Sequence, residues 1–431
     1  METEKQAAAS SGRSSVKPSF GKICVIGLGY VGLPTAAVFA GRGVQVLGVD
    51  VNEETVSLIN RGKAHIVEPD LDIMVNSAVV TGKLRASVKI EPADAFIIAV
   101  PTPLREDNKP GLQYVREAAL SLAPVLKKGD LVVIESTCPV GTTEAFSERL
   151  AELRPDLTFP HRSGNEADVQ VAHSPERVLP GRVLLELVRN DRVIGGVSRR
   201  CSERTVELYR IAVEGKCLMT TARTAELVKL AENAYRDVNI AFANELSLVC
   251  DKLDIDVWEA VRLANHHPRV NVLNPGPGVG GHCIAVDPWF IVDSAHEETP
   301  LIRAARRVND GKPRHIADKV LKAAQELKAP CIACLGLAYK ADIDDLRESP
   351  AVEIVRMLGE SGKGRMLVVE PHINALPDRL AGIAGIQLTD LDRALAAADI
   401  VVLLVDHNPF KGLDRERLHG KIVFDTRGVW R

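Results

Sequence analysis

A glycine-rich turn between two apolar runs constrains the fold of this chain more than any other feature. Residues 22–27 form a strand-length apolar run, residues 33–42 read as a helix, and residues 45–49 form a second strand ending in Asp50. The turn after the first strand reads Gly27-Leu-Gly29-Tyr-Val-Gly32. This order is typical of the βαβ unit that opens a dinucleotide-binding sheet.

Each glycine has its own task in such a turn. Gly27 permits the tight turn, Gly29 lets the backbone approach a pyrophosphate, and Gly32 allows close helix–strand packing. Asp50 can accept both hydroxyls of the adenosine ribose, and Val51 offers nothing to a 2′-phosphate, so NAD is expected rather than NADP. The alternative is a Rossmann-like domain that binds no nucleotide.

Two further strand-like runs, residues 95–100 and 131–135, each lead into a hydroxyl-rich turn. Open α/β sheets bind ligands at the carboxyl ends of their strands, so Thr102, Thr137 and Thr143 are candidates for contact with cofactor or water. Helix N-capping explains a threonine in such a turn equally well.

The loop motif Ser174-Pro-Glu176-Arg177-Val178 offers a carboxylate beside a guanidinium. Glu176 is a candidate for orienting a water or acting as a base, and Arg177 for binding an anion. A surface charge pair has the same residues, and the motif alone favours that interpretation.

Residues 221–253 contain neither Gly nor Pro and are apolar on nearly every face, which predicts a long and largely buried helix. Lys229, Asn233 and Asp237 form one polar stripe at four-residue steps. A buried lysine suits proton transfer because desolvation lowers its pKa, and Asn233 can hydrogen-bond a substrate hydroxyl. A lysine that snorkels from a partly exposed face is the alternative.

The stretch from Pro275 to Phe290 sets Cys283 in a loop with glycines at 276, 278, 280 and 281, and Asp287 follows. A thiol so placed is a candidate nucleophile, although a lone cysteine is more often an ordinary buried one. His266 and His267 precede the loop, but partner ligands at zinc spacing are missing, so no metal is expected.

A last α/β unit is predicted from four strands. They are expected at residues 331–337, 366–370, 399–405 and 421–425. Lys340 and Arg347 lie near a strand end and a helix start, the place for a diphosphate. The glycine-rich turn is lacking, so a nucleotide other than NAD is expected here. Cys331 and Cys334 would face opposite sides of their strand and share neither a metal nor a disulfide.

Composition sets the remaining limits. The 431 residues suffice for two or three domains, and a net charge of −3 gives no support to a nucleic-acid partner. The longest apolar runs have strand length, so no membrane span is expected, and eight scattered cysteines point to free thiols in a reducing cytoplasm. Residues 1–20 read as a disordered tail, because residues 1–19 are polar, rich in alanine and serine, and lack hydrophobic periodicity.

Residues 21–431 resemble the UDP-sugar 6-dehydrogenases. The motifs GLGYVGLP, VPTP, ESTCPVGTT, SPER, GVGGHC, GLAYK and DDLRESPA occur in order, with the Lys229/Asn233 helix among them. HIVEPDL at residues 65–71 and PERVLPG at 175–181 are most similar to the branch that oxidises UDP-N-acetyl-D-mannosamine. The UDP-glucose branch has a lysine where this chain has Val286.

The resemblance implies an α/β fold with two Rossmann-like doubly wound domains joined by a long central helix. An NAD-binding domain is expected at residues 21–205, a helical dimerisation and catalytic domain at 206–310, and a UDP-sugar-binding domain at 311–431. The expected reaction is a four-electron oxidation at C6 for cell-surface polysaccharide synthesis. The glucosamine epimer, a two-electron hydroxyacid dehydrogenase and a non-catalytic nucleotide-binding protein are the alternatives.

The resemblance also implies roles for individual residues. Lys229 and Asn233 would assist deprotonation of the C6 alcohol, and Cys283 would hold the aldehyde as a thiohemiacetal and then a thioester between two hydride transfers to NAD. Water would be ordered by Glu176, Thr137 and Asp287. NAD would contact Tyr30, Val31, Asp50, Thr102, Thr143 and Arg347, besides the turn glycines. The UDP-sugar would contact Arg177, Val178, Lys229, Asn233, Arg236, His267, Arg269, Gly280, Tyr339, Lys340 and Arg427. Arg269 would reach a neighbouring subunit's site, so a homodimer is expected.

Overall fold

The computed structural model describes residues 20–179 and 181–431, which form two compact units. The first comprises the residues up to Pro101, 113–136 and 141–225; the second comprises 102–112, 137–140 and 226–431. The expected disordered tail lies outside the described residues except for Phe20. Phe20 is fully buried in the core of the first unit, so assigning it to the tail was wrong.

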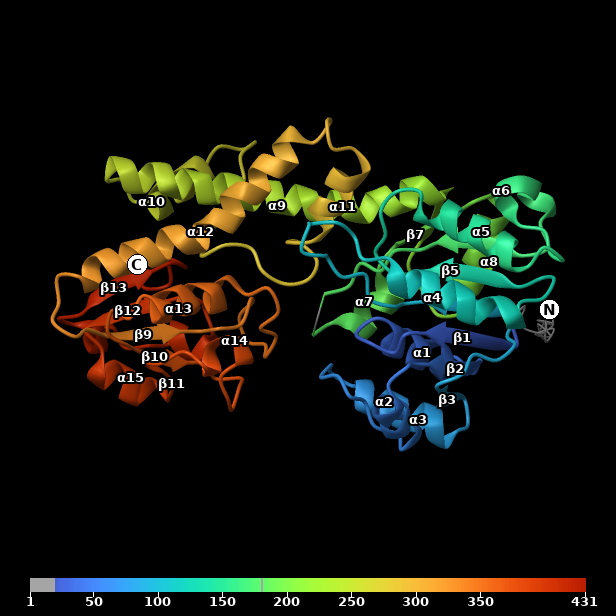
Figure 1. The fold of residues 1–431 in the computed structure, drawn as a ribbon, viewed down its shortest axis with the longest axis horizontal. Helices are drawn as coiled ribbons and strands as arrows, with labels where there is room; N and C mark the ends of the chain where they lie inside the picture. Colours follow the sequence, from blue (N-terminus) through green and yellow to red (C-terminus); the bar gives the residue numbers. More distant parts are fainter. Residues whose placement is uncertain (1–19, 180) are drawn as a thin grey trace, which may run out of the picture. The chain divides into compact units, whose positions relative to one another are not determined.

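The first unit contains an eight-stranded sheet with the order β3-β2-β1-β4-β5-β6-β7-β8 (Figure 1). Neighbouring strands are parallel except β6 and β7, which are antiparallel. The strands are β1 (Lys22–Ile26), β2 (Gln45–Val49), β3 (Leu84–Ser87), β4 (Ala95–Ile98), β5 (Leu131–Ile134), β6 (Gln170–His173), β7 (Arg192–Gly196) and β8 (Cys217–Thr221). The predicted βαβ opening is confirmed, because β1 pairs with β2 and both are parallel.

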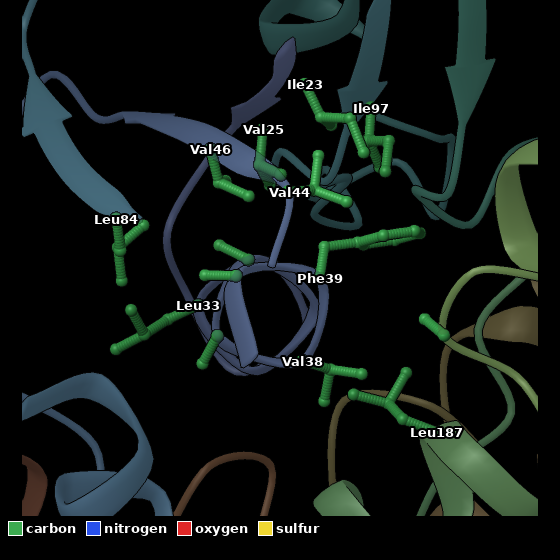
Figure 2. Close-up of a cluster of buried hydrophobic side chains, with 14 of the residues drawn as sticks. Ile23, Val25, Leu33, Val38, Phe39, Val44, Val46, Leu84, Ile97 and Leu187 are labelled. Atoms are coloured by element: carbon green, nitrogen blue, oxygen red, sulfur yellow. The ribbon is translucent and has the colours of Figure 1, made fainter. Parts of the chain in front are cut away.

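Apolar helix faces cover this sheet. Figure 2 shows Leu33, Val38 and Phe39 of α1 among strand side chains such as Val25 and Val46, all of them within one buried cluster. The helices of this unit are α1 (Gly32–Gly41), α2 (Glu53–Asn60), α3 (Leu71–Val80), α4 (Gln113–Leu122), α5 (Thr142–Leu153), α6 (Pro160–Ser163), α7 (Val183–Arg189) and α8 (Arg199–Tyr209). Parallel strands with helices between them confirm the doubly wound α/β prediction.

The second unit contains a five-stranded parallel sheet with the order β11-β10-β9-β12-β13. Its strands are β9 (Cys331–Leu335), β10 (Arg365–Val369), β11 (Ile386–Leu388), β12 (Ile400–Leu403) and β13 (Ile422–Asp425). Four of these were predicted, and the three-residue β11 was not. The helices are α10 (Val257–Ala264), α11 (Asp287–Ser294), α12 (Pro300–Ala324), α13 (Pro350–Glu360), α14 (Asp378–Ala381), α15 (Leu391–Ala397) and α16 (Asn408–Lys411).

Side chains alternate between the two faces of this second sheet. Cys334 of β9 lies in the buried cluster that includes α12 and α13, whereas Cys331 lies in the cluster that includes α15. The prediction that these two cysteines point to opposite sides is confirmed, and all eight cysteines are free thiols.

Helix α9 (Ala222–Leu253) confirms the predicted length but not the predicted burial. Tyr235 is 71% exposed, Phe242 59% and Val249 47%, so one apolar face of the helix is open in the single chain. The apolar letters alone could not reveal this, because apolar side chains also occur on surfaces that associate. Among the described helices, α9 included, none is long and apolar enough to cross a membrane.

Candidate active site

The glycine turn after β1 has the three separate features expected of a pyrophosphate cradle. Gly27 has φ of +89° and donates its amide to Val49 O at 2.8 Å. A Cβ on Gly32 would lie 1.8 Å from Gly27 O, whereas a Cβ on Gly29 would meet nothing within 4 Å. The open space therefore lies at the glycine expected to face the pyrophosphate, and the residues present fit NAD.

Asp50 stands at the end of β2 beside this turn. Its carboxylate accepts the amides of Leu28 at 2.9 Å and Asn52 at 3.0 Å. The acidic group is thus held in place while remaining partly exposed, as recognition of a ribose requires.

The other first-unit cofactor candidates surround the starts of two helices. Tyr30 is 39% exposed in the turn, and Val31 is the N-cap residue of α1. Gly141 is the N-cap of α5, and the buried Thr143 is the second residue of that helix, so N-capping does not explain Thr143. Thr102 and Arg347 belong to the second unit.

Four predicted catalytic residues meet in the second unit as two hydrogen-bonded pairs. Lys229 Nζ donates to Thr137 Oγ1 at 2.5 Å, and Asn233 Nδ2 donates to Asp287 Oδ2 at 2.6 Å. Lys229 and Asn233 are half-buried one turn apart on α9, whereas Asp287 is the first residue of α11 and is 2% exposed. The polar stripe of α9 thus reaches the segment that follows Cys283.

Cys283 is partly buried near these groups. Burial raises the pKa of its thiol; the charge of Lys229 opposes this rise, and the carboxylate of Asp287 adds to it. Burial likewise raises the pKa of Asp287, against the charge of Lys229 and the hydrogen bond from Asn233. Lys229 is therefore the cation that favours both the thiolate and the carboxylate.

The glycines of the Cys283 loop are required by close neighbours. Gly281 has φ of +79°, and a Cβ there would lie 2.9 Å from the ring of Tyr339. A Cβ on Gly280 would lie 2.7 Å from the carbonyl oxygen of Glu348, and one on Gly276 would lie 2.7 Å from Arg427 Nη1. The loop therefore contacts two of the predicted UDP-sugar residues, Tyr339 and Arg427.

The remaining substrate candidates of the second unit are at its surface. Arg236, Lys340, His267 and Arg269 are exposed. Arg347 forms a bidentate pair with Asp345, with Nε–Oδ1 and Nη2–Oδ2 distances of 2.9 and 2.6 Å. Asp345 was not predicted, although its place two residues before Arg347 in DDLRESPA would have allowed it.

Glu176 corrects the expectation of a surface charge pair. It is 6% exposed, accepts the amide of Arg177 at 2.7 Å and is hydrogen-bonded by the buried Arg192. Arg192 also donates to Glu135 at 3.0 Å, and burial together with the charge of Glu176 raises the pKa of Glu135 against the effect of Arg192. The sequence gives no signal for this pairing, since Arg192 lies 16 residues from Glu176 and 57 from Glu135. Arg177 and Val178 follow Glu176 in the same first-unit loop.

One group of possible metal ligands occurs among the described residues, namely Asp342, His372 and His407. The amide of Asp342 donates to His407 Nδ1 at 2.9 Å, and His407 Nε2 lies 3.0 Å from Glu370. Because both ring nitrogens already have protein partners, this imidazole has no lone pair to offer an ion.

Comparisons with known proteins identify the family of this chain. Residues 21–213, 223–311 and 333–431 match the models of the NAD binding, central and UDP binding domains of the UDP-glucose/GDP-mannose dehydrogenase family. The chain is 59% identical to an NDP-N-acetyl-D-galactosaminuronic acid dehydrogenase of Ralstonia nicotianae, over 95% of this chain and 96% of that protein. It is 57% identical to the UDP-N-acetyl-D-mannosamine dehydrogenase of Escherichia coli, over 96% and 100%.

A solved structure extends the comparison to the fold. The UDP-N-acetyl-D-mannosamine dehydrogenase of Pyrococcus horikoshii has a TM-score of 0.85 at 40% identity, covering 95% of this chain and 96% of that one. The predicted family, fold class, enzyme class and NAD cofactor are thereby confirmed. This chain belongs to the UDP-glucose/GDP-mannose dehydrogenase family of NAD-dependent nucleotide-sugar dehydrogenases.

Proposed function

We propose that this enzyme oxidises UDP-N-acetyl-D-mannosamine at C6 to UDP-N-acetyl-D-mannosaminuronate. The observation that carries the proposal is the grouping of Cys283 with the Lys229–Thr137 and Asn233–Asp287 pairs. A thiol is needed only if an aldehyde must be held between two oxidations. The amino-sugar class is supported by relatives named for N-acetylhexosamine substrates or products in both Escherichia coli and Ralstonia.

In the first oxidation the C6 alcohol becomes an aldehyde. Lys229 stabilises the alkoxide as the hydroxyl proton passes to solvent, and Asn233 holds the oxygen by a hydrogen bond. The Gly27–Gly32 turn would hold NAD, and one NAD molecule would take up the hydride of each oxidation, so that two NAD are reduced per sugar. Thr137 keeps Lys229 in place through its 2.5 Å hydrogen bond.

In the second oxidation the Cys283 thiolate adds to the aldehyde carbon and forms a thiohemiacetal. Loss of the second hydride gives a thioester, which water hydrolyses to release the carboxylate and restore the thiol. The proximity of Lys229 favours the thiolate against the burial that raises the pKa of Cys283. Asp287 and Thr137 are proposed to orient the water. Glu176 is proposed to help order the same water from a fixed position, since both of its carboxylate oxygens already accept hydrogen bonds.

The test is the number of NADH molecules formed per sugar. The purified enzyme is given limiting UDP-N-acetyl-D-mannosamine, with the glucosamine and galactosamine isomers assayed beside it. We expect two NADH per mannosamine nucleotide, a lower kcat/KM for the other two isomers, and less than about 1% of the activity in Cys283→Ala because the covalent step is lost. One NADH per sugar, or full activity in Cys283→Ala, would overturn the proposal. A preference for another isomer would reassign the substrate within the same chemistry.

The exposed apolar face of α9 supports a homodimer, and the free cysteines support a cytoplasmic location. Tyr235, Phe242 and Val249 recur every seven residues on this face, the spacing of a seam between paired helices, and eight free cysteines suit a reducing compartment. Analytical ultracentrifugation of Phe242→Glu should show a monomer. The control Ile73→Glu alters an exposed apolar residue of α3 and should stay dimeric. A monomeric wild-type enzyme would contradict the proposed dimer.

A further inference from the structure

The loop that carries Cys283 is fixed at three points. The amide of Gly281 donates to Arg347 O at 3.2 Å, Asn233 holds Asp287 at 2.6 Å, and the amide of Gly276 donates to Asn244 Oδ1 at 2.9 Å. Between these points the glycines leave the backbone little stiffness of its own. The position of the thiol therefore depends on its anchors, and Asn244 is a fully buried anchor on α9.

Asn244 is the last link of a buried hydrogen-bond chain between α9 and α12. Its Nδ2 donates to Asn309 Oδ1 at 2.9 Å. Asn309 Nδ2 donates to Asp237 Oδ1 at 2.7 Å and to the carbonyl oxygen of Asp237 at 3.0 Å. Arg306 holds Asp237 at 2.5 Å. Asp237, Asn309 and Asn244 are each at most 1% exposed, and Arg306 is 2% exposed, so water does not compete for these groups.

Asp237 gives this chain a direction. Its carboxylate and its carbonyl oxygen only accept hydrogen bonds, so Asn309 must present its amino group to them and its oxygen to Asn244. Asn244 must then use its amino group for Asn309, which leaves its oxygen for the amide of Gly276. A reversed chain would set the amino group of Asn244 against the amide of Gly276, donor against donor.

We infer that Asp237, Asn309 and Asn244 are positioning residues that hold the Cys283 loop in a fixed position against α9, the helix that also carries Lys229 and Asn233. This inference rests on the proposed function. Loosening the loop should harm the capture of the aldehyde by Cys283 while sparing the oxidation of the alcohol, which uses residues of α9 itself.

The variants Asn244→Asp and Asp237→Asn each weaken this chain. In Asn244→Asp an acceptor faces Asn309 Oδ1. In Asp237→Asn the charged acceptor shared by Arg306 and Asn309 becomes a neutral amide, and only the carbonyl oxygen of residue 237 still fixes the orientation of Asn309.

The two oxidations are measured separately in the full-length enzyme. Semicarbazide traps the aldehyde and reports the first oxidation, and supplied UDP-N-acetylmannosamine 6-aldehyde reports the second. We expect each variant to slow aldehyde oxidation about 10- to 100-fold and alcohol oxidation less than about threefold. The rate of Cys283 alkylation by iodoacetamide should follow the aldehyde step.

Lys312→Met is the matched control. Lys312 Nζ donates to Ser247 Oγ at 2.5 Å, another buried hydrogen bond between α9 and α12 that does not involve the Cys283 loop. We expect this variant to leave the ratio of the two oxidation rates unchanged. Equal losses in both oxidations, or the same imbalance in Lys312→Met, would each contradict the inference. The alkylation measurement needs no sugar, so it tests the anchor even if the proposed substrate is wrong.

Discussion

The two sheets of this enzyme share a strand order and a glycine turn, but they differ in the exposure of the acidic residue beside that turn. In the first sheet β3-β2-β1-β4-β5, and in the second β11-β10-β9-β12-β13, the chain makes the same crossovers. Gly27 and Gly336 both have positive φ, +89° and +96°, and each donates its amide to the end of the neighbouring strand at 2.8 Å. The two turns therefore have a common backbone plan.

The acidic residue after the second strand of each unit separates the two sheets. Asp50 is partly exposed, whereas Glu370 is 5% exposed and accepts the amides of Leu337 at 2.7 Å and Ala338 at 3.0 Å. His407 Nε2 lies 3.0 Å from the same carboxylate. Asp50 is available to a ribose, whereas the carboxylate of Glu370 already accepts hydrogen bonds from its own turn. A shared fold thus gives one sheet whose acid is open to a ribose and one whose corresponding acid is buried and hydrogen-bonded within its own turn.

The largest effect should come from filling the third glycine of the first turn. A Cβ in Gly32→Ala would lie 1.8 Å from Gly27 O, so the turn must open. We expect NAD affinity to fall about 100-fold, which corresponds to about 3 kcal/mol of overpacking. Fluorescence titration with NADH measures the change. Gly41→Ala, at the exposed end of α1 with nothing within 4 Å of its Cβ, should bind NADH normally and serves as the control.

Exchanging each acid for its amide should separate binding from stability. Asp50→Asn should weaken NAD about 10-fold or more with little change in Tm, because a charged acceptor for the ribose is lost. Glu370→Gln should cost about 2 kcal/mol of stability with little change in the KM for NAD, because a buried acceptor of several hydrogen bonds becomes partly a donor. Steady-state kinetics and thermal melts distinguish the two variants. A similar outcome for both would contradict the assignment of a binding role to Asp50 and a structural role to Glu370.

Lowering the pH should destabilise the second turn through protonation of Glu370. Burial raises the pKa of this carboxyl, but hydrogen bonds from His407, Leu337 and Ala338 outweigh it and hold the pKa below its ordinary range. A depressed pKa contributes stability that is present above the unfolded pKa, about 4.3, and is lost as pH falls through the folded value. The difference in Tm between wild type and Glu370→Gln should therefore be constant above about pH 5 and narrow below about pH 4. A difference that widens in acid would contradict this assignment.

The smallest effects should come from the helix caps beside the two turns. Asn52 Oδ1 accepts the amides of Glu54 and Thr55 in the first unit, and Asn52→Ala should cost about 1 kcal/mol without disturbing the turn. Ser349 caps α13 but also donates to Leu337 O at 2.6 Å. Ser349→Ala should therefore speed hydrogen exchange in residues 336–340, whereas Asn52→Ala should leave exchange in residues 27–32 unchanged.

The sequence alone determined the features that neighbouring residues impose on one another. Glycine spacing, the acid after β2, the length of α9 and the helix start near Arg347 were all readable because conformational limits and hydrogen-bond periods act over a few residues. The order of motifs then predicted the family.

Only the tertiary structure decided which distant groups meet and which faces stay open. Glu176 is joined to Arg192, Glu370 to His407, and Gly276 to Asn244, across 16, 37 and 32 residues. Burial of a charge or an amide becomes acceptable only when topology brings a partner, which local pattern cannot report. The exposure of the apolar face of α9 could not be predicted either, because hydrophobicity indicates that a surface will be covered but not whether the same chain covers it.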